Sequence, residues 1–581
     1  THPPGGGYRT CRLNQFGSRC YVLDDGGRSN SFCNRIGRSK RKYRSSFASG
    51  IGGVYNKFRL SVHDCRDIVV SIIIISAYCI AMKLNRCGRG RRDSGTGAAN
   101  GGSLSELPAE VQACNGDKLR ELPADLEAGN RDRLSELPAD LLLNILERVG
   151  TLDAVKTCIL SKKMQKLPTM LSQIVIDLST DDLVRIHTVV ANVTNKILNA
   201  RSSKITIRKL KLKFFLSPSH CLSIGKCVGL AMADQKVDSA EFEILTPRNG
   251  HLCTETYRLL FAQQFNDFFR DCPDAFAGLT GLHLQYMRFG ESDITNILSY
   301  CKQLESLSLF MCDEGVSSVM RVEHARLVEL VISHCEFKTV ELTFLPKLQR
   351  MTFNSWPSCA EHPLALGFVP ELLKLSLAKA CFSHKTLKLS QLLANVLSVN
   401  DLSLEFRSEK IWIRPESPKV LSPWLAKLRF VNLDNLPEEC DIAWTMFLLE
   451  AAPFVVEFCI MVWDHKCHME SQKSYSEKTD VKWEPSDPDF KHKNLAKLTI
   501  YGFQSDDNFT GHIRRVMAAA VNIKEVSLHD RKVCKVCAVK FPHVEVRPSS
   551  YPRTSDEKDL LRNKITETLS KASPAVIHFC S

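Results

Sequence analysis

Apolar residues recur along this chain in two rhythms, and each rhythm predicts a different element. Over residues 134–149 they fall three or four positions apart, which is the spacing of one face of an α-helix: Leu137, Leu141, Leu142, Ile145, Leu146 and Val149. Pro138 lies where the first turn of a helix tolerates a missing amide, and Asp140 places an anion near the positive helix end. We therefore predict a short amphipathic helix that stops at Gly150.

A second short helix is predicted directly after the first. Thr151 is a suitable N-cap, and the apolar residues that follow it are Ala154, Val155, Cys158 and Ile159. A lysine-rich segment then surrounds Met164 and Leu167 before Pro168 ends the pattern. Three short helices of about forty residues in total bury too little surface to be stable alone. We therefore expect this unit to dock on a partner.

The second rhythm is the pattern L-x-x-L-x-L, which occurs in seven successive copies. The copies start at Leu279, Leu304, Leu327, Leu348, Leu372, Val399 and Leu425, so that successive starts are 25, 23, 21, 24, 27 and 26 residues apart. This spacing lies in or near the period of leucine-rich repeats. Each x-L-x-L portion predicts a short strand whose alternate side chains point inward, and the seventh copy is read as Leu425, Leu428 and Phe430. Cys312 and Cys335 are expected to turn inward and satisfy loop backbone groups.

Stacking these strands predicts a parallel sheet on a concave face, with helices or irregular segments outside it. Weaker copies near Ile207, Val455, Leu495 and Ile523 extend the array to about residues 204–546. Residues 218–276 are predicted as helices between early strands, and the polar, proline-bearing residues 464–492 as an exposed loop. The predicted fold class is α/β, with an N-terminal three-helix unit followed by an irregular leucine-rich-repeat solenoid.

The helical unit resembles a known family in its residues LPADLLLNILERV and AVKTCILSKKMQKLP. They are similar to the F-box, the module that binds the adaptor in SCF ubiquitin ligases. The resemblance implies that these residues contact a Skp-type adaptor: Leu137, Pro138, Leu141, Leu142, Ile145, Leu146, Ala154, Val155, Leu160, Ser161 and Met164. Plant members usually read LSKRW after the second helix, and Met164 holds the aromatic position here. We therefore expect a lower adaptor affinity, which Met164→Trp would raise.

The order of parts over about residues 134–579, ending in a module that contains VSLHDRKVCKVC, resembles plant F-box/leucine-rich-repeat proteins with an FBD-like tail. The resemblance implies a substrate-recognition subunit of an SCF-type ubiquitin ligase, without catalysis of its own, that joins a cullin through the adaptor. Strand alternation offers these outward residues as a target-binding surface: His283, Gln285, Ser308, Phe310, Val331, Ser333, Ser376 and Ser403. The alternative is a repeat scaffold whose degenerate F-box is not coupled to ubiquitination.

The resulting division has six parts. They are a disordered or non-native upstream extension (1–81), a flexible linker with partial LxELPA repeats (82–131), the F-box (132–179), the repeats (204–462), a polar inserted loop (463–492) and a C-terminal FBD-like region (493–581). The linker copies LSELPAE and LRELPAD lack the apolar helix that follows the third copy. We therefore expect no adaptor binding from them.

The net charge of +13 invites a nucleic-acid function, but its location argues against one. Residues 1–93 hold 14 arginines, 4 lysines and 5 aspartates, and 14 + 4 − 5 gives +13, which leaves the other residues near neutral. The body of the chain shows no basic face with interleaved aromatic residues. We therefore expect no nucleic-acid partner.

Residues 68–82 are the sole membrane candidate in the sequence. As a helix these residues would span about 22 Å, which is short of the roughly 30 Å hydrocarbon core. A membrane-tethered repeat receptor is therefore a second alternative. Translation from Met82 would remove the segment, and we expect the chain to act in the cytoplasm, the nucleus or both.

The cysteines and short motifs predict no cofactor. The 23 cysteines are irregularly spaced, which favours a reduced chain. Cys534 and Cys537, even with His529 and His543 nearby, make at most half of a zinc site, and the adjacent pair Cys467 and His468 predicts no catalytic dyad. The chain carries no P-loop, H-E-x-x-H or G-x-S-x-G motif. We therefore predict neither a resident metal nor an active site.

Overall fold

A parallel sheet of 14 strands organises the chain, and a second parallel sheet of three strands accompanies it. The computed structural model describes residues 137–157, 164–177, 183–201, 205–248, 250–356, 363–379, 386–407, 411–438, 440–462, 483, 487, 489–531, 549–567, 569 and 575–580. Contacts divide the chain into two units, one of residues 21–145 and one that contains residues 1–20 and 146–581, and both sheets lie within the latter. The predicted α/β class with a parallel sheet is confirmed.

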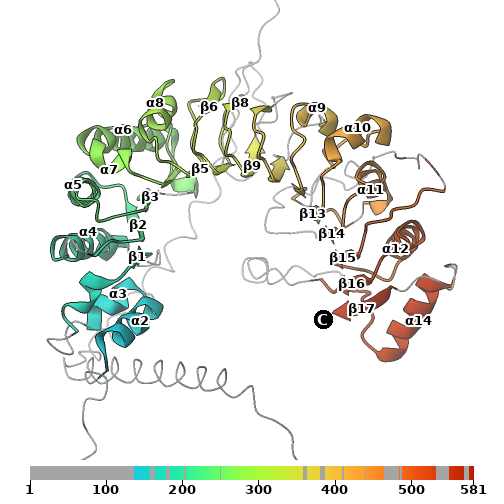
Figure 1. The fold of residues 1–581 in the computed structure, drawn as a ribbon. Helices are drawn as coiled ribbons and strands as arrows, with labels where there is room; N and C mark the ends of the chain where they lie inside the picture. Colours follow the sequence, from blue (N-terminus) through green and yellow to red (C-terminus); the bar gives the residue numbers. More distant parts are fainter. Residues whose placement is uncertain are drawn as a thin grey trace, which may run out of the picture. The chain divides into compact units, whose positions relative to one another are not determined.

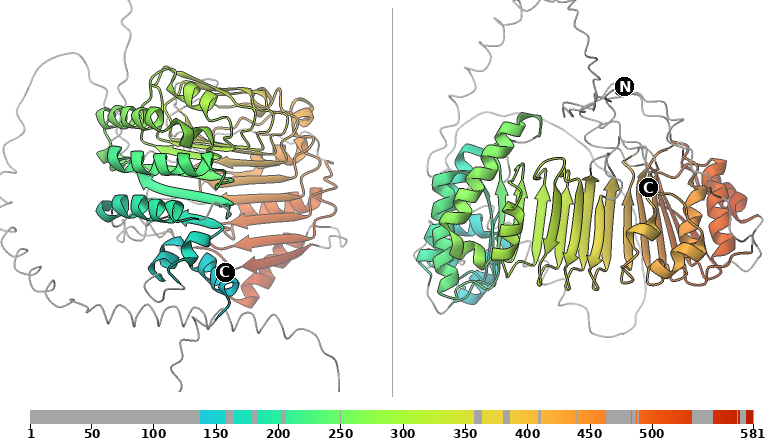
Figure 2. Two further views of the ribbon diagram at one scale, coloured as in Figure 1. Left: turned by 60° about the vertical axis from the view of Figure 1, so that its left-hand side comes forward. Right: turned by 90° about the horizontal axis from the view of Figure 1, so that it is seen from above.

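The strands of the large sheet follow one another almost in chain order. They are β1 (Gln173–Ile176), β2 (Lys209–Phe215), β3 (Ala240–Leu245), β4 (Gly281–Gln285), β5 (Ser306–Phe310), β7 (Glu329–Ser333), β9 (Arg350–Trp356), β11 (Lys374–Lys379), β12 (Asp401–Glu405), β13 (Phe430–Leu436), β14 (Glu457–Val462), β15 (Lys497–Tyr501), β16 (Glu525–His529) and β17 (Val576–Cys580). Figures 1 and 2 show them side by side, with the sheet on the inner side and the helices outside.

The helices before the sheet and around it range from single turns to helices of 17 residues. They are α2 (Ala139–Val149), α3 (Thr151–Lys156), η3 (Leu167–Met170), α4 (Leu183–Asn199), α5 (Pro218–Ala233), η5 (Gly250–Leu252), α6 (Glu255–Asp271), α7 (Pro273–Ala277), α8 (Asp293–Tyr300), α9 (Leu389–Leu392), α10 (Pro418–Leu425), η6 (Ile442–Thr445), α11 (Met446–Ala451), α12 (Asp507–Ala519) and α14 (Ser555–Thr566). None of the described helices is long and apolar enough to cross a membrane. Residues 68–82 lie outside the described part of the chain.

The repeat leucines form one continuous ladder across the sheet. The first inward position of each strand pairs in register with its neighbour, and each of these side chains is at most 2% exposed: Leu282, Leu307, Leu330, Met351, Leu375, Leu402, Val431, Phe458, Leu498 and Val526. Burying a side chain of this size contributes about 1.5–3 kcal/mol. The ladder is therefore a main source of stability for the array.

The seventh repeat lies three residues after its predicted position, so that prediction is wrong. Leu402 pairs with Val431, whereas Phe430 pairs with Asp401 and is 40% exposed. The correct inward set is therefore Leu428, Val431 and Leu433. Leu425 resembles a repeat leucine in sequence because it is the buried last residue of α10 and lies three positions before Leu428.

The sheet contains strands that the sequence pattern does not predict. Residues 240–245, predicted within a helical segment, form β3 between β2 and β4, and only the segments on either side of it form α5 and α6. Its residues alternate, with Ala240, Phe242 and Ile244 buried and two glutamates between them. The strands β1 and β17 add further pairs at the two ends.

The middle repeats are backed by strands where helices or irregular segments were predicted. The small sheet has the order β10-β8-β6, formed by β6 (Val319–Glu323), β8 (Thr339–Phe344) and β10 (Leu364–Phe368). These are among the shortest repeats, with periods of 23, 21 and 24 residues. A strand rises about 3.3 Å per residue and a helix 1.5 Å, so a strand returns the chain with fewer residues.

Two cysteines occupy the inward loop position as predicted. Cys312 and Cys335 are buried, and their thiols donate to the carbonyl oxygens of Phe310 and Ser333 at 3.4 and 3.3 Å. Cys335 also donates to Leu309 of the preceding repeat at 3.5 Å. Burial raises the pKa of the Cys312 thiol to about 12. These thiols therefore act as structural donors.

A buried ionic cluster fastens α6 to the repeats. Asp313 is fully buried and accepts hydrogen bonds from Arg258 of α6 and from Arg288, the latter at 2.8 Å. Arg288 also donates to Glu336 at 2.8 Å. Arg258 and Asp313 are 55 positions apart in sequence, so the cluster depends on the fold.

Candidate interaction surfaces

The α2 helix divides its leucines between a buried side and an open side. Its first turn begins at Pro138, whose carbonyl oxygen accepts hydrogen bonds from the amides of Leu141 and Leu142, each at 3.1 Å. Leu142 and Leu146 are 1% and 3% exposed, whereas Leu141 is 52% exposed and Pro138 is also exposed. An exposed leucine beside an exposed proline is the feature that a partner surface would cover.

The C-terminal end of α2 is tied to the first strand of the sheet. Glu147 accepts hydrogen bonds from the hydroxyl and the amide of Ser172 at 2.6 and 3.1 Å. The hydroxyl bond is the main reason why the pKa of the Glu147 carboxyl lies below its usual value. Gly150 separates α2 from α3 with a φ of 98°, a conformation that other residues adopt at a cost.

Of the remaining predicted adaptor residues, two are buried and three are half-buried. Ala154 and Met164 are 0% and 2% exposed, and Val155, Leu137 and Ile145 are half-buried. Leu160 and Ser161 lie outside the described residues. Because Met164 is buried in this structure, a larger side chain there is expected to overpack the site, which changes the outcome we expect from Met164→Trp.

A buried arginine that the sequence pattern does not predict connects segments of this region. Arg201 is 5% exposed and donates to the carbonyl oxygens of Thr169, Ile205 and Thr206 at 2.9, 2.8 and 3.0 Å. Burial lowers the pKa of its guanidinium. The residue joins η3 to the segment before β2. An isolated arginine in a polar loop gives no sequence signal for such a role.

The predicted target-binding residues lie on the strands in two rows. Strand register places His283 beside Ser308 and Val331, and Gln285 beside Phe310 and Ser333. Ser376 and Ser403 pair on β11 and β12. All eight side chains are half-buried. The structure therefore brings six together on three adjacent strands and two on a later pair.

The first row continues through residues that the prediction left out. Thr352 lies between Val331 and Ser376, and further positions follow Ser403 across the sheet: Asn432, Cys459, Thr499 and Ser527. Most of these side chains are small and polar. Thr499 and Ser527 are buried, so the partly exposed portion of the row ends at Cys459.

An aromatic cluster marks the edge of β4, β5 and β7. The ring of Phe310 lies 5.5 Å from that of Tyr286 and 5.3 Å from that of His334, centroid to centroid. Tyr286 and His334 follow their strands with φ of 54° and 56°. Their amides still donate to the next strand, at 2.9 and 3.0 Å. Such interstrand bonds hold the side chains at this edge.

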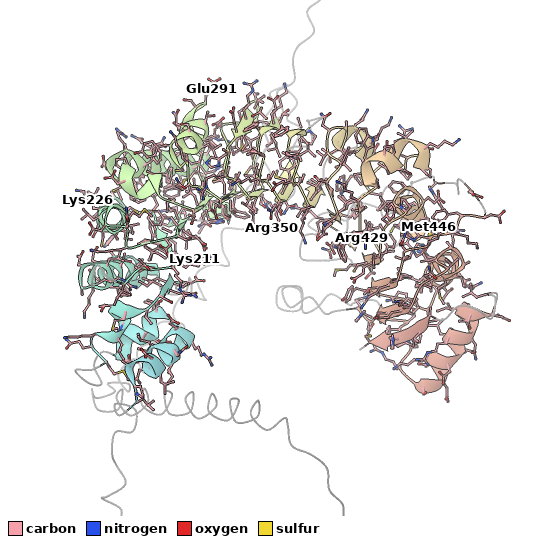
Figure 3. The ribbon with its side chains drawn as sticks, viewed as in Figure 1. Lys211, Lys226, Glu291, Arg350, Arg429 and Met446 are labelled. Atoms are coloured by element: carbon pink, nitrogen blue, oxygen red, sulfur yellow. The ribbon has the colours of Figure 1, made fainter. Side chains whose placement is uncertain are left out.

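On several strands a charged residue lies two positions before the residue of the row that contains His283, Ser308 and Val331. These charged residues form ion pairs between neighbouring strands. Arg350 contacts Glu329 at 3.3 Å, Lys374 contacts Asp401 at 2.9 Å, and Lys497 contacts Glu525 at 2.9 Å. Figure 3 labels Arg350 and Lys211 on the inner side of the array. Exposed pairs of this kind contribute about 0–1 kcal/mol each. They neutralise the face more than they stabilise it.

Two half-buried carboxyl groups lie near Ser403 on this face, that of Glu405 on β12 and that of Asp434 on β13. Ser403 donates to Asp434 at 3.0 Å, and the Asn435 amide donates to both oxygens of Glu405 at 2.8 and 2.9 Å. Burial raises the pKa of both Glu405 and Asp434, and burial lowers the pKa of His283 at the other end of the row.

The described residues contain no group of three or more His, Cys, Asp or Glu side chains that could hold a metal ion. His529 stacks on Tyr501, with their ring centroids 4.3 Å apart. Cys467, His468, Cys534, Cys537 and His543 lie outside the described part of the chain.

Comparison with known families assigns the class. An F-box domain matches residues 134–175, and the leucine-rich-repeat domain described as At1g61320/AtMIF1, LRR domain matches residues 271–550. A search of curated proteins finds no match. The chain therefore carries an F-box domain and a leucine-rich-repeat domain of a plant-type family, an arrangement consistent with the plant F-box/leucine-rich-repeat proteins that the sequence pattern predicted.

Proteins of this class are typically non-catalytic substrate receptors of SCF ligases, and F-box domains usually bind a Skp-type adaptor that links to a cullin. The repeat match begins within α6, although the sheet already begins at β1. The FBD-like character of the C-terminal region and the domain boundaries stay predictions.

Proposed function

We propose that this chain is the substrate-recognition subunit of an SCF-type ubiquitin ligase. The carrying observation is that an F-box match and a leucine-rich-repeat array occur in one chain, with Leu141 and Pro138 of the F-box open to solvent. The F-box binds the Skp-type adaptor, and the strand face of the repeats binds a protein target.

In this proposal the chain does not itself catalyse the transfer of ubiquitin. It holds the target near the ubiquitin-conjugating enzyme, which raises the effective concentration of target lysines. No metal or other cofactor is required. The ligase acts in the cytoplasm, the nucleus or both, and fractionation of the tagged chain tests that location.

On the adaptor side, the exposed Pro138 and Leu141 make the first contact. The half-buried Leu137, Ile145 and Val155 border them. The buried Leu142, Leu146, Ala154 and Met164 support this surface from within. Burying an apolar side chain at an interface contributes about 25 cal/mol per Å², so a few leucine-sized contacts dominate adaptor affinity.

A pull-down with purified Skp-type adaptor tests the proposal. The wild-type chain is expected to retain the adaptor, and Leu137→Ala/Pro138→Ala is expected to lose it. Asn144→Ala, an exposed position on the same helix, is the matched control and should bind as the wild type does. Failure of the wild type to bind would refute the ligase function.

The competing proposal is a repeat scaffold that is not coupled to ubiquitination. The burial of Leu142, Leu146 and Met164 favours it, because the open docking face is narrower than the family resemblance implied. A scaffold predicts target capture without adaptor retention and without target ubiquitination in a reconstituted reaction. The same pull-down therefore separates the two.

A further inference from the structure

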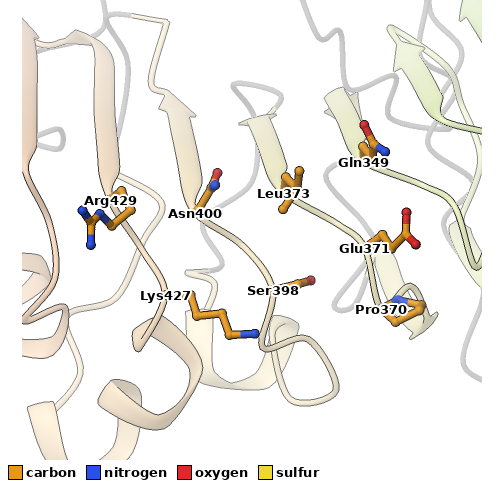
Figure 4. Close-up of a pocket in the computed structure, with 8 residues that line it drawn as sticks. All are labelled: Gln349, Pro370, Glu371, Leu373, Ser398, Asn400, Lys427 and Arg429. Atoms are coloured by element: carbon orange, nitrogen blue, oxygen red, sulfur yellow. The ribbon is translucent and has the colours of Figure 1, made fainter.

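A groove of about 570 Å³ crosses one edge of the array, where β9, β11, β12 and β13 begin. Each of these repeats contributes the residue immediately before its strand: Gln349, Leu373, Asn400 and Arg429. The loops before them add Pro370, Glu371, Ser398 and Lys427. The groove therefore runs across the repeats, from the start of one strand to the start of the next (Figure 4).

Three backbone amides beneath the groove already donate hydrogen bonds within the chain. The amides of Leu373, Asn400 and Arg429 each donate to the carbonyl oxygen of the preceding groove residue, at 2.9, 2.9 and 2.8 Å. The backbone is thus occupied in holding the repeats together. A ligand in the groove would meet side chains.

The cations of the groove lack the acidic partners that earlier repeats provide. Earlier in the array, Arg326 precedes its repeat leucine and pairs at 3.1 Å with Glu305 of the preceding repeat. Lys427 holds the same repeat position as Arg326, but the position equivalent to Glu305 is Asn400, which is neutral. No ion pair is recorded for Lys427, Arg429 or Glu371 among the residues that the structure describes.

The groove also offers an apolar contact. Leu373 lies in its lining and is 43% exposed, and Leu397 and Phe430, next in sequence to Ser398 and Arg429, are exposed as well. Figure 4 shows the Lys427 amine extending toward Ser398, with Glu371 at the other end of the groove. The groove thus combines a cationic end, neutral polar groups and exposed leucine.

We propose that this groove binds an extended acidic segment of a protein target, with carboxylates at Lys427 and Arg429 and an apolar side chain over Leu373. The proposal rests on the proposed function, because it assumes that the array receives a protein target. Charge complementarity selects the acidic segment, and the exposed leucine selects a peptide over a nucleic acid. The carboxylate of Glu371 restricts the acidic residues of such a segment to the end with Lys427 and Arg429, whereas a phosphate backbone carries negative charge along its whole length.

Fluorescence anisotropy with the full chain tests this groove. The probe is a labelled ten-residue peptide that carries one leucine and three glutamates, and its control carries glutamine in place of each glutamate. The glutamate peptide is expected to bind about tenfold more tightly. Lys427→Glu and Arg429→Glu should each weaken it about fivefold or more, and Glu371→Gln should strengthen it about twofold.

Lys302→Glu is the matched control, because Lys302 is an exposed lysine in the loop before β5. It should leave peptide affinity within twofold of the wild type. Equal binding of the two peptides, or equal weakening by Lys302→Glu and Lys427→Glu, would overturn the proposal. Tighter binding of a single-stranded oligonucleotide, with the same dependence on Lys427, would also overturn it.

The adaptor pull-down keeps this test separate from the proposed function. A Lys427→Glu chain that retains the adaptor but loses the peptide supports the groove. A wild-type chain that binds the peptide but not the adaptor refutes the ligase function and leaves the groove intact.

Discussion

Leucines recur regularly both in the α2 helix and in the repeat strands, but they differ in burial between the two regions. In the repeats, Leu375 and its ladder neighbours are covered by other repeats of the same chain. In α2, Leu141 follows an equally regular apolar spacing but is 52% exposed. Apolar periodicity therefore predicts which face of an element is apolar. The tertiary structure decides whether that face is buried within the chain or stays exposed to a partner.

The same contrast holds for charge. Asp313 is enclosed by arginines of its own chain, whereas Arg350 meets Glu329 at the surface. The molecule therefore has buried and exposed examples of both leucines and charged residues. Single substitutions at these positions test the contrast between buried and exposed residues.

Asp313→Ala should have the largest effect. It leaves Arg258 and Arg288 without their carboxylate, and breaking a buried pair costs about 3–5 kcal/mol. Urea unfolding followed by circular dichroism measures the loss. Asp153→Ala, which breaks an exposed pair with Lys156, is the control and should cost less than about 1 kcal/mol. A small loss for Asp313→Ala would mean that the cluster is not structural.

Leu375→Ala should cost about 2–5 kcal/mol, because it opens a cavity between neighbouring repeats. Ser376→Ala, the next residue on the opposite face of β11, should change the free energy of unfolding by less than about 1 kcal/mol. Native-state hydrogen exchange should place the loss in β9, β11 and β12. Equal effects of the two substitutions would contradict the assigned register.

His512 should make stability depend on pH. It is buried in α12, and desolvation lowers its pKa to about 3, from an ordinary value of 6.5. The folded state thus binds fewer protons, so its contribution is complete above pH 6.5 and is lost as the pH falls toward 3. The loss is on the order of 1 kcal/mol per pH unit.

The control for this pH dependence replaces the histidine. His512→Leu should flatten the acid side of the stability profile between pH 6.5 and 4, whereas His578→Gln, at an exposed position, should leave it unchanged. An unaltered acid slope in His512→Leu would show that other groups cause it.

Leu141→Ala should reduce adaptor affinity about tenfold, which is about 1.4 kcal/mol, while changing the free energy of unfolding by about 0.5 kcal/mol or less. Titration calorimetry with purified adaptor measures the first quantity, and urea unfolding measures the second. The prediction fails if stability falls and affinity does not, because Leu141 would then belong with the covered leucines.

Arg350→Ala should have the smallest effect, less than about 1 kcal/mol, because its pair with Glu329 is exposed and screened by salt. The difference from wild type should shrink further in 1 M salt. If Arg350→Ala lowered the free energy of unfolding as much as Asp313→Ala does, the distinction between buried and exposed ion pairs would be wrong.

Much of the fold follows from local pattern. The spacing of Leu282, Leu307, Leu330 and their successors predicts both the strands and their buried faces, because a strand places every second side chain on one face. The inward turn of Cys312 and Cys335 follows from the same register. The α2 helix likewise follows from its apolar spacing and its proline.

Other features needed the tertiary structure. Leu425 belongs to α10 and not to the seventh repeat, the shortest repeats return through β6, β8 and β10, and β3 lies inside a segment predicted as helical. In each case two elements share similar local patterns. Only pairing with neighbouring strands separates them.

The sequence by itself determined the class of this protein: a helical docking unit followed by a stacked leucine array, because both are written in short-range periodicity. The tertiary structure decided which residues are covered and which are presented. It buried Met164 and Leu142 but left Leu141 open, joined Arg258 to Asp313, and placed Lys427 beside Asn400 and Ser398 in a groove. These features depend on contacts between distant segments, which no local pattern records.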